Sequence, residues 1–178
     1  MTAALFDKGE PNDLLLWLGV ANSLTMDFVV RKKVRLKMSL SIMDSLPFPR
    51  DWRAAPRADS IIERVYALST VGPEMQDFRS KASAMHRSLL GVTPVEDVEV
   101  RAKLSAEVEA LVAGAIYDLT RDNMRYILDP GDILGDDCGV ETFRVLRDRE
   151  RRELGEYRTQ RLVLEAWDRF FPALTKAN

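Results

Sequence analysis

The sequence predicts a mainly α-helical fold, with at most a short extended or β element near residues 38–43. Apolar residues recur at the three- and four-residue spacing of amphipathic helices through most of the 178 residues. Sequences typical of helix starts and stops separate these segments. The stretch 38–42 alternates apolar and polar residues with the period of two that is typical of a strand.

The first predicted helix begins at Asn12 or Asp13 and continues to about Val34. Apolar side chains surround most of its circumference, so we expect it to be the central helix of the fold or to pack on a partner. Its longest apolar run, Leu14 to Ala21, is far shorter than the ~20 residues of a membrane span. Acidic residues precede that run where a signal peptide would be basic. We therefore expect neither a membrane segment nor a signal peptide.

The chain is predicted to divide into two parts at residue 57. Residues 1–57 hold the long helix and a basic arm, whose extended piece ends at Pro47-Phe48-Pro49. Residues 51–58 have the composition of a linker. Residues 58–178 are predicted to form a C-terminal helical domain.

Five helices are predicted in the second part from apolar periodicity and capping sequences. A capping box of Ser60 and Glu63 begins the first, and Thr93-Pro94-Val95-Glu96 begins the third. The expected ranges are about 60–68, 74–90, 93–117, 120–128 and 153–170, with a loop at 129–140. The inward-facing residues of the last helix are expected to be Leu162, Val163, Ala166, Trp167 and Phe170.

Cysteine content and charge limit the compartment and the partners. The single cysteine, Cys138, excludes an internal disulfide, which fits a reducing compartment and a cytoplasmic location. The net charge of −2 alone does not indicate nucleic acid. However, residues 31–57 contain eight basic and two acidic residues, a local net charge of +6, so the remainder of the chain is acidic. Such asymmetry bears on partners rather than on fold.

Motifs of DNA-modifying catalysis are missing from the sequence. No two prolines are adjacent, so the Asn/Asp-Pro-Pro-aromatic loop of amino-methyltransferases is absent. No Gly-x-Gly occurs that could bind a methyl donor or a dinucleotide, and no lysine follows an acidic residue at the spacing of metal-dependent nucleases. We expect the chain to be non-catalytic, with no methyl transfer, no DNA cleavage and no bound S-adenosylmethionine.

Candidate metal ligands are few. His86 is the only histidine and is expected to be an ordinary helix residue. Cys138 lies in an acidic loop, where a reactive thiolate is disfavoured. Four loop carboxylates could hold a divalent cation, but their spacing matches no EF-hand, so a solvated or capping loop is the preferred interpretation. These carboxylates belong to Asp129, Asp132, Asp136 and Asp137.

A run of five cations within residues 31–37 is the strongest candidate for contact with an anion. Such a run costs electrostatic repulsion, which phosphates would relieve in a salt-dependent way. The alternative is a solvated helix end whose cations complement the helix dipole, an effect well under ~1 kcal/mol for each cation. Phe48 and Trp52 flank the run and could stack on a base, although core positions are the alternative. The predicted DNA-binding residues are Arg31, Lys32, Lys33, Arg35, Lys37 and Arg50.

A second charged stretch, from Arg144 to Arg161, mixes seven arginines with four acidic residues. Alternating charge along a helix is typical of a salt-bridged solvent face, so this stretch by itself predicts a scaffold helix. Glu156 is expected to pair with Arg152 or with Gln160, one turn away.

Two parts of the sequence resemble a known family. The strings YDLTRDNMRYILDP, ETFRVL and GEYRTQRLVLEAWDRF are similar to the extreme C-terminus of type IIG-like restriction–modification and phage-defence adenine-specific DNA methyltransferases. The string LLLWLGVANSLTMDFVVRKKVRLKMSLSIMDSLPFPR resembles the end of their target-recognition region, with Asn22-Ser23, a basic turn and Leu46-Pro47-Phe48-Pro49. The resemblance covers roughly residues 12–57 and 98–171, and the helices between them match only in style.

The resemblance implies a target-recognition tail that helps to hold DNA or packs against a catalytic methyltransferase domain or subunit. The family uses S-adenosylmethionine, but none of its catalytic positions carries over, because the matching stretch lies beyond them. The chain is too short for the whole enzyme, so we expect a fragment, a split-gene product or a free-standing accessory. The alternative is a helical protein–protein docking module for a catalytic subunit, without direct DNA contact.

Overall fold

The computed structural model describes residues 10–33, 41, 44–48, 54–140 and 142–172. Within these residues the chain is mainly α-helical and contains no strand, as the sequence predicts. The α-helices are α2 (Pro11–Ala21), α3 (Leu24–Lys33), α5 (Ala58–Ser69), α6 (Gln76–Met85), α7 (Val98–Leu111), α8 (Arg121–Leu128), α9 (Gly131–Leu134), α10 (Arg144–Leu154) and α11 (Arg158–Phe170). Shorter helical turns are η2 (Pro73–Met75), η3 (Arg87–Leu89), the π-helical η4 (Val112–Ile116) and η5 (Asp136–Cys138).

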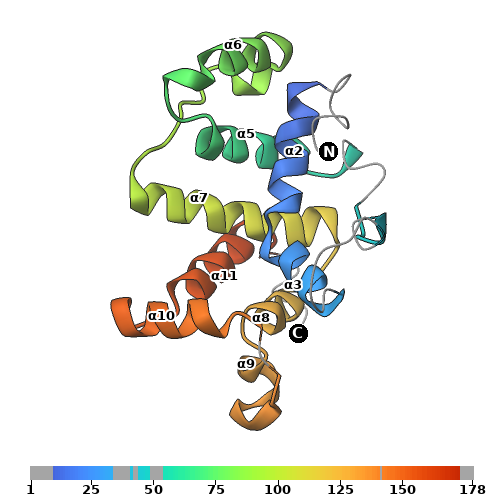
Figure 1. The fold of residues 1–178 in the computed structure, drawn as a ribbon, viewed down its shortest axis with the longest axis vertical. Coiled ribbons are helices and arrows are strands. Elements are labelled where there is room, and N and C mark those ends of the chain that lie inside the picture. Colours follow the sequence, from blue (N-terminus) through green and yellow to red (C-terminus); the bar gives the residue numbers. More distant parts are fainter. Residues whose placement is uncertain (1–9, 34–40, 42–43, 49–53, 141, 173–178) are drawn as a thin grey trace.

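Helix α7 is the central element of the molecule (Figure 1). It packs against α5 on one side and α11 on the other, and α2 crosses α5. One hydrophobic cluster joins α2, α5 and α7 and contains Leu16, Ile61 and Leu111. A second joins α7, α8 and α11 and contains Ala110 and Trp167. Because α7 contributes to both clusters, it couples the two halves of the fold.

Helix α2 approaches α5 closely because its contact residue is a glycine. A Cβ atom at Gly19 would lie 2.9 Å from Cγ2 of Val65, which is closer than Cβ atoms come to their neighbours, and 3.1 Å from Cγ2 of Ile61, which is a tight contact. Helix α2, which precedes residue 57, shares one core cluster with α5 and α7, which follow it. The division at residue 57 stays a prediction.

The single long helix expected from residue 12 to residue 34 is wrong, because α2 and α3 meet at an angle of 61°. The Asn22 side chain donates to the Leu18 carbonyl at 3.0 Å and thereby ends α2. Ser23 begins α3, since its Oγ accepts from the Met26 N–H at 3.2 Å. The expected cap at the N-terminus also shifts: Asp13 lies inside the first turn and accepts from the Glu10 N–H at 3.3 Å.

The apolar circumference of α2 is covered largely within this chain. Leu15, Leu16 and Val20 are buried, and Trp17 stacks on Phe48 with ring centroids 6.3 Å apart. Among the described residues no single helix is long and apolar enough to cross a membrane, and only α2 and α3 taken together, despite their bend, meet that length and composition.

The segment expected to be extended, 38–43, lies mostly outside the described residues. Its described member, Ser41, is helical, as is Asp44. The Ser45 N–H donates to the Ser41 carbonyl at 3.2 Å, which is a helical hydrogen bond. The described part of this segment is therefore helical rather than extended.

Tertiary contacts move two of the expected helix starts. Helix α5 begins at Ala58 rather than Ser60, after Arg57 in the left-handed region at φ 66°, where the Arg57 guanidinium donates to the Phe170 carbonyl. Helix α7 begins after Asp97, whose carboxylate accepts from the Val100 N–H at 2.9 Å. The residues expected to begin it are non-helical, because the Val95 N–H donates to the Ala67 carbonyl at the end of α5.

The rest of the chain departs from the expectation in three places: a short helix, α9, lies inside the loop expected at 129–140, and two helices change their bounds. The helix expected over 74–90 breaks at His86, and the helix expected from 153 begins later, at Arg158. Helix α10 precedes it, and Gly155, at φ 77°, makes the left-handed turn between them. The start of α8 is confirmed: Thr120 Oγ1 accepts from the Asn123 N–H at 3.1 Å. The expected inward-facing residues of α11 are buried, except the partly buried Phe170.

Candidate anion-binding site

Half of the predicted DNA-binding residues lie within the described structure. Arg31, Lys32 and Lys33 form the exposed last turn of α3. The other three, Arg35, Lys37 and Arg50, lie outside the described residues.

Each of the three described cations already has a contact within the chain. Arg31 pairs with Asp27 at 2.9 Å. The Lys32 ammonium lies 5.3 Å from the ring centroid of Phe28. The Lys33 ammonium donates to the carbonyl and the hydroxyl of Ser45, at 2.6 and 3.1 Å. These contacts hold the cations at the end of α3 but are exposed, so each contributes little to stability.

The structure brings Arg31 together with arginines that the sequence places more than a hundred residues away. The guanidinium of Arg31 lies over the Phe143 ring at 5.1 Å, at the start of α10. Between them opens a cleft of about 500 Å³, here called the arginine cleft. Its lining residues are Arg31, Thr142, Phe143, Arg144, Val145, Leu146 and Arg149.

The arginine cleft is electropositive. Three of its described lining residues are arginines and none is acidic. Arg149 is exposed and makes no ion pair or hydrogen bond to the described part of the chain. The first turn of α10 contains no acidic residue, and the positive end of its dipole lies at the cleft. An anion in the cleft would be attracted most directly by the exposed guanidinium of Arg149.

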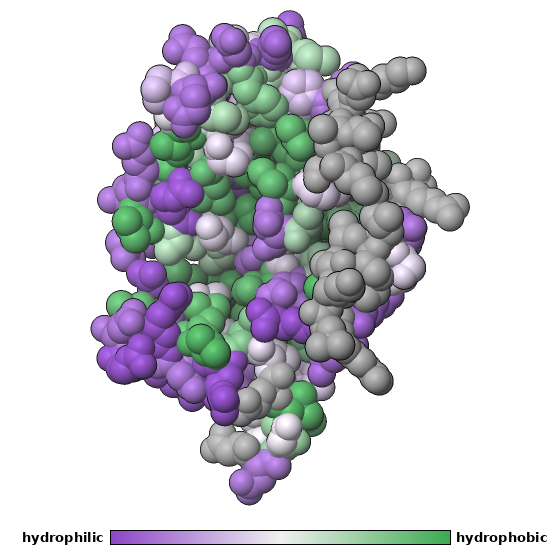
Figure 2. Space-filling view, in the orientation of Figure 1, coloured by the Kyte–Doolittle hydropathy of each residue, from purple (hydrophilic) through white to green (hydrophobic). Residues whose placement is uncertain are grey.

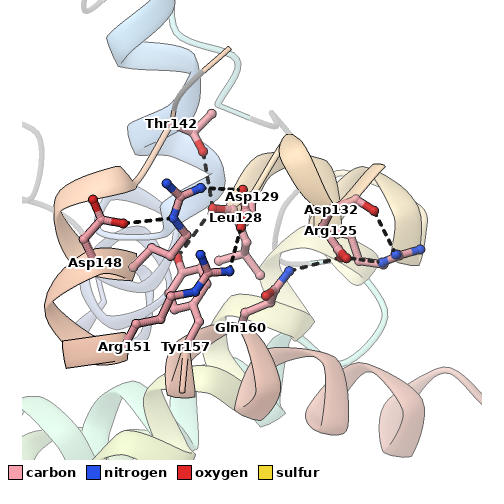
Figure 3. A network of polar contacts seen from close by, with 10 residues as sticks. Arg125, Leu128, Asp129, Asp132, Thr142, Asp148, Arg151, Tyr157 and Gln160 are labelled. Atoms are coloured by element: carbon pink, nitrogen blue, oxygen red, sulfur yellow. Dashed lines mark hydrogen bonds and ion pairs between the residues drawn. The ribbon is translucent and has the colours of Figure 1, made fainter. Parts of the chain in front are cut away.

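A buried polar network fixes α10 beside α8 and so positions the cleft (Figure 3). The Asp129 carboxylate, at the end of α8, accepts from Arg147 at 2.8 Å and from Arg151 at 3.5 Å. The hydroxyls of Thr142 and Tyr157 donate to the Leu128 carbonyl at 3.3 and 3.5 Å. Because Asp129 is buried, its two arginines compensate a charge that would otherwise be costly.

Tyr157 and Glu150 connect this network to α11. Burial, together with the charges of Glu150 and Asp129, raises the pKa of Tyr157, so its hydroxyl stays neutral and can donate. The buried Glu150 carboxylate accepts from the Thr159 N–H and from the Thr159 hydroxyl, both at 2.7 Å, near the start of α11. Helix α10 therefore caps the helix that follows it.

The Arg144–Arg161 stretch divides into two groups with different surroundings. The salt-bridged arginines, as the scaffold interpretation predicts, are Arg147, Arg151, Arg152, Arg158 and Arg161. Arg144 and Arg149 instead line the cleft. The expected partners of Glu156 are wrong: it pairs with Arg161 at 2.8 Å, and this contact lowers its pKa.

Arg144 and Arg149 were not among the predicted site residues, although the sequence contains a feature that indicates their helix, α10. Gly155 is a typical residue just beyond a helix C-terminus, and it marks the end of α10. If α10 is recognised as a separate helix, Arg144 lies in its first turn. Helical spacing then places Arg149 on a different face from Arg147 and Arg151, which contact Asp129 at the end of α8. Nothing in the sequence, however, indicates that α3 ends beside Arg144 and Arg149.

Four of the six candidate metal ligands, His86, Asp129, Asp132 and Cys138, have contacts within the protein. His86 Nε2 lies 3.4 Å from Asp59, and its Nδ1 lies 3.3 Å from the Ser88 hydroxyl. Asp132 accepts from Arg125 at 2.8 Å, and the thiol of Cys138 contacts the Val140 carbonyl at 3.6 Å. The described residues contain no group of three or more His, Cys, Asp or Glu side chains arranged to hold a metal ion. The side chain of Asp136 lies outside the described residues.

The sequence matches no protein-family model, and no match is found among curated proteins or solved structures.

Proposed function

We propose that this chain is the DNA-recognition and scaffold portion at the C-terminus of a bacterial restriction–modification adenine-N6 DNA methyltransferase, and that it is not catalytic alone. The observation that supports this best is the arginine cleft, in which Arg31 of α3 meets Arg144 and Arg149 of α10. The cations predicted to contact DNA thus continue into a second group of cations on the same surface. The family assignment rests on the sequence resemblance.

Phosphate is the ligand that suits this cleft best. Guanidinium groups present planar forks of donors that match phosphate oxygens. The neighbouring Lys32 and Lys33 would extend the contact along a nucleic-acid backbone. Such contacts position a protein on a duplex but carry no base sequence information. We therefore expect DNA binding that is weak, independent of sequence and steeply dependent on salt.

In this proposal S-adenosylmethionine belongs to the catalytic domain or subunit of the enzyme. The purified chain is then expected neither to methylate nor to cleave DNA, and not to bind the methyl donor. Measurable adenine methylation by the chain alone would contradict the proposal.

A docking module for a catalytic subunit is the second candidate. Val145, in the wall of the cleft, is 81% exposed, and Phe143 and Leu146 lie beside it. An exposed apolar side chain among arginines is also typical of protein interfaces, where arginine is enriched.

A triple substitution separates the two functions. The variant Arg31→Ala, Arg144→Ala and Arg149→Ala removes the cleft cations, all of which are exposed. The control variant Lys81→Ala, Arg87→Ala and Lys103→Ala makes the same change in net charge at exposed positions outside the cleft. Fluorescence anisotropy with duplex DNA is measured for both across a range of salt concentrations.

We expect the cleft variant to flatten the log–log salt dependence by about 2 to 3 units, since each phosphate contact contributes about 0.9. The control variant should keep the slope of the parent chain. If the parent chain does not bind DNA at low salt, or if both variants lose binding equally, the DNA proposal fails and the docking candidate remains.

A further inference from the structure

A second pocket lies between α2, α5 and α7. It has a volume of about 200 Å³, and its apolar walls include Leu18, Val65 and Val108. Figure 2 shows apolar side chains gathered in the hollow between α5 and α7 on the face that it draws. Polar groups at the pocket come from Asn22, Ser69, Ser105 and Glu109.

Glu109 is the one ionisable residue in the described lining of this pocket. One of its carboxyl oxygens, Oε2, accepts from the Leu24 N–H at 2.8 Å, in the first turn of α3. Burial of the carboxyl group raises its pKa to about 8, against the lowering effect of the Leu24 hydrogen bond and with a further rise from Asp27. An unpaired carboxylate at this position is therefore unfavourable.

We propose that this pocket binds a lysine side chain presented by a partner polypeptide, with the ammonium on the free oxygen of Glu109. The methylene stem of lysine suits apolar walls, while its charged end needs one oxygen acceptor. Oxygens of Asn22 and Ser105 supply further acceptors for the ammonium hydrogens. This pocket shares no described lining residue with the arginine cleft.

The geometry of Glu109 favours lysine over arginine. Arginine pairs best with both oxygens of a carboxylate at once. Since Oε2 already accepts from the Leu24 N–H, Oε1 is the more available acceptor for a ligand. A compact ammonium needs just one such oxygen.

Binding of an ammonium requires Glu109 to lose its proton. The proton leaves to solvent, and the carboxylate pairs with the lysine ammonium, so the pocket stays neutral overall. Among the described residues, Asp27 of α3 also acts on Glu109 and raises its pKa, while Arg31 pairs with Asp27 at 2.9 Å. Affinity should therefore rise as the pH increases from about 6 to about 9, over which Glu109 ionises and lysine stays charged.

Two acetylated and amidated tripeptides test this proposal, Gly-Lys-Gly and Gly-norleucine-Gly. They share the stem and differ in the ammonium group. Binding is followed by the amide resonance of Leu24 and by calorimetry at a pH above the pKa of Glu109. We expect the lysine peptide to bind at least about tenfold more tightly, the effect of one charge-assisted hydrogen bond.

Three variants test whether the preference for the lysine peptide depends on this pocket. Glu109→Gln keeps an oxygen for the Leu24 N–H and should abolish the preference for lysine. Ser105→Trp, at an exposed position of the rim, should block both peptides, while Lys103→Trp on the same helix should bind as the parent does. Equal binding of the two peptides, no binding of the lysine peptide, or an unchanged preference in Glu109→Gln would each overturn the proposal.

Discussion

At the scale of single residues, the polar groups whose removal should cost the most stability are the buried charged ones. Asp129 is the clearest case, because its side chain is 7% exposed and accepts from two arginines. Removing it leaves Arg147, which is half-buried, without its main partner. We expect Asp129→Ala to lower the free energy of unfolding by about 1 to 3 kcal/mol. The exposed Asp148→Ala, which breaks another Arg147 contact, should cost less than about 1 kcal/mol, and chemical denaturation measures both.

The Glu109 carboxyl gives a residue-scale prediction about pH. Its pKa rises from 4.5 to about 8 on folding, so the native state holds a proton that the unfolded chain releases between these values. Stability from this group is therefore fully present below pH 4.5 and is lost as the pH rises towards 8. Between pH 5 and 9 the parent chain should lose about 4 kcal/mol relative to Glu109→Gln, since each pKa unit corresponds to about 1.4 kcal/mol. The free energy of unfolding of both proteins is measured by denaturation at several pH values. An equal change with pH in the parent chain and in Glu109→Gln would contradict this assignment.

At the scale of elements, the junction between α2 and α3 depends on a helix cap. The Ser23 hydroxyl donates to the Val20 carbonyl at 2.8 Å and accepts from the Met26 N–H, so it serves both helix ends. We expect Ser23→Ala to destabilise the fold by about 1 kcal/mol. The control Ser80→Ala, on the exposed face of α6, should change stability by less than about 0.5 kcal/mol. Thermal unfolding followed by circular dichroism distinguishes the two variants.

At the scale of the whole molecule, α7 couples two hydrophobic clusters. Its residues Val108 and Leu111 belong to one and Ala110 to the other. We therefore expect cooperative unfolding in which Val163→Ala, in the second cluster, also lowers hydrogen-exchange protection in α5. Protection that falls only in α8 and α11 would instead indicate two independently stable units.

Periodicity and composition were enough to predict the class of fold and the buried face of α11. Four of the five expected inward residues, from Leu162 to Trp167, are buried, because the spacing of apolar residues directly encodes which helix face packs. The start of α8 was also predictable, since the Thr120–Asn123 cap is local in sequence. These features depend on neighbours within a few residues.

The tertiary structure decided where helices begin and which charges meet. Helix α7 starts late because Val95 bonds to the end of α5, and α5 starts early beside Arg57, which reaches Phe170. The arginine cleft likewise depends on Arg31 and Arg149 meeting across the fold. Local spacing and caps predicted the helical class, the start of α8 and the apolar face of α11, but not the break between α2 and α3. The site arises from packing between distant segments, which local patterns do not encode.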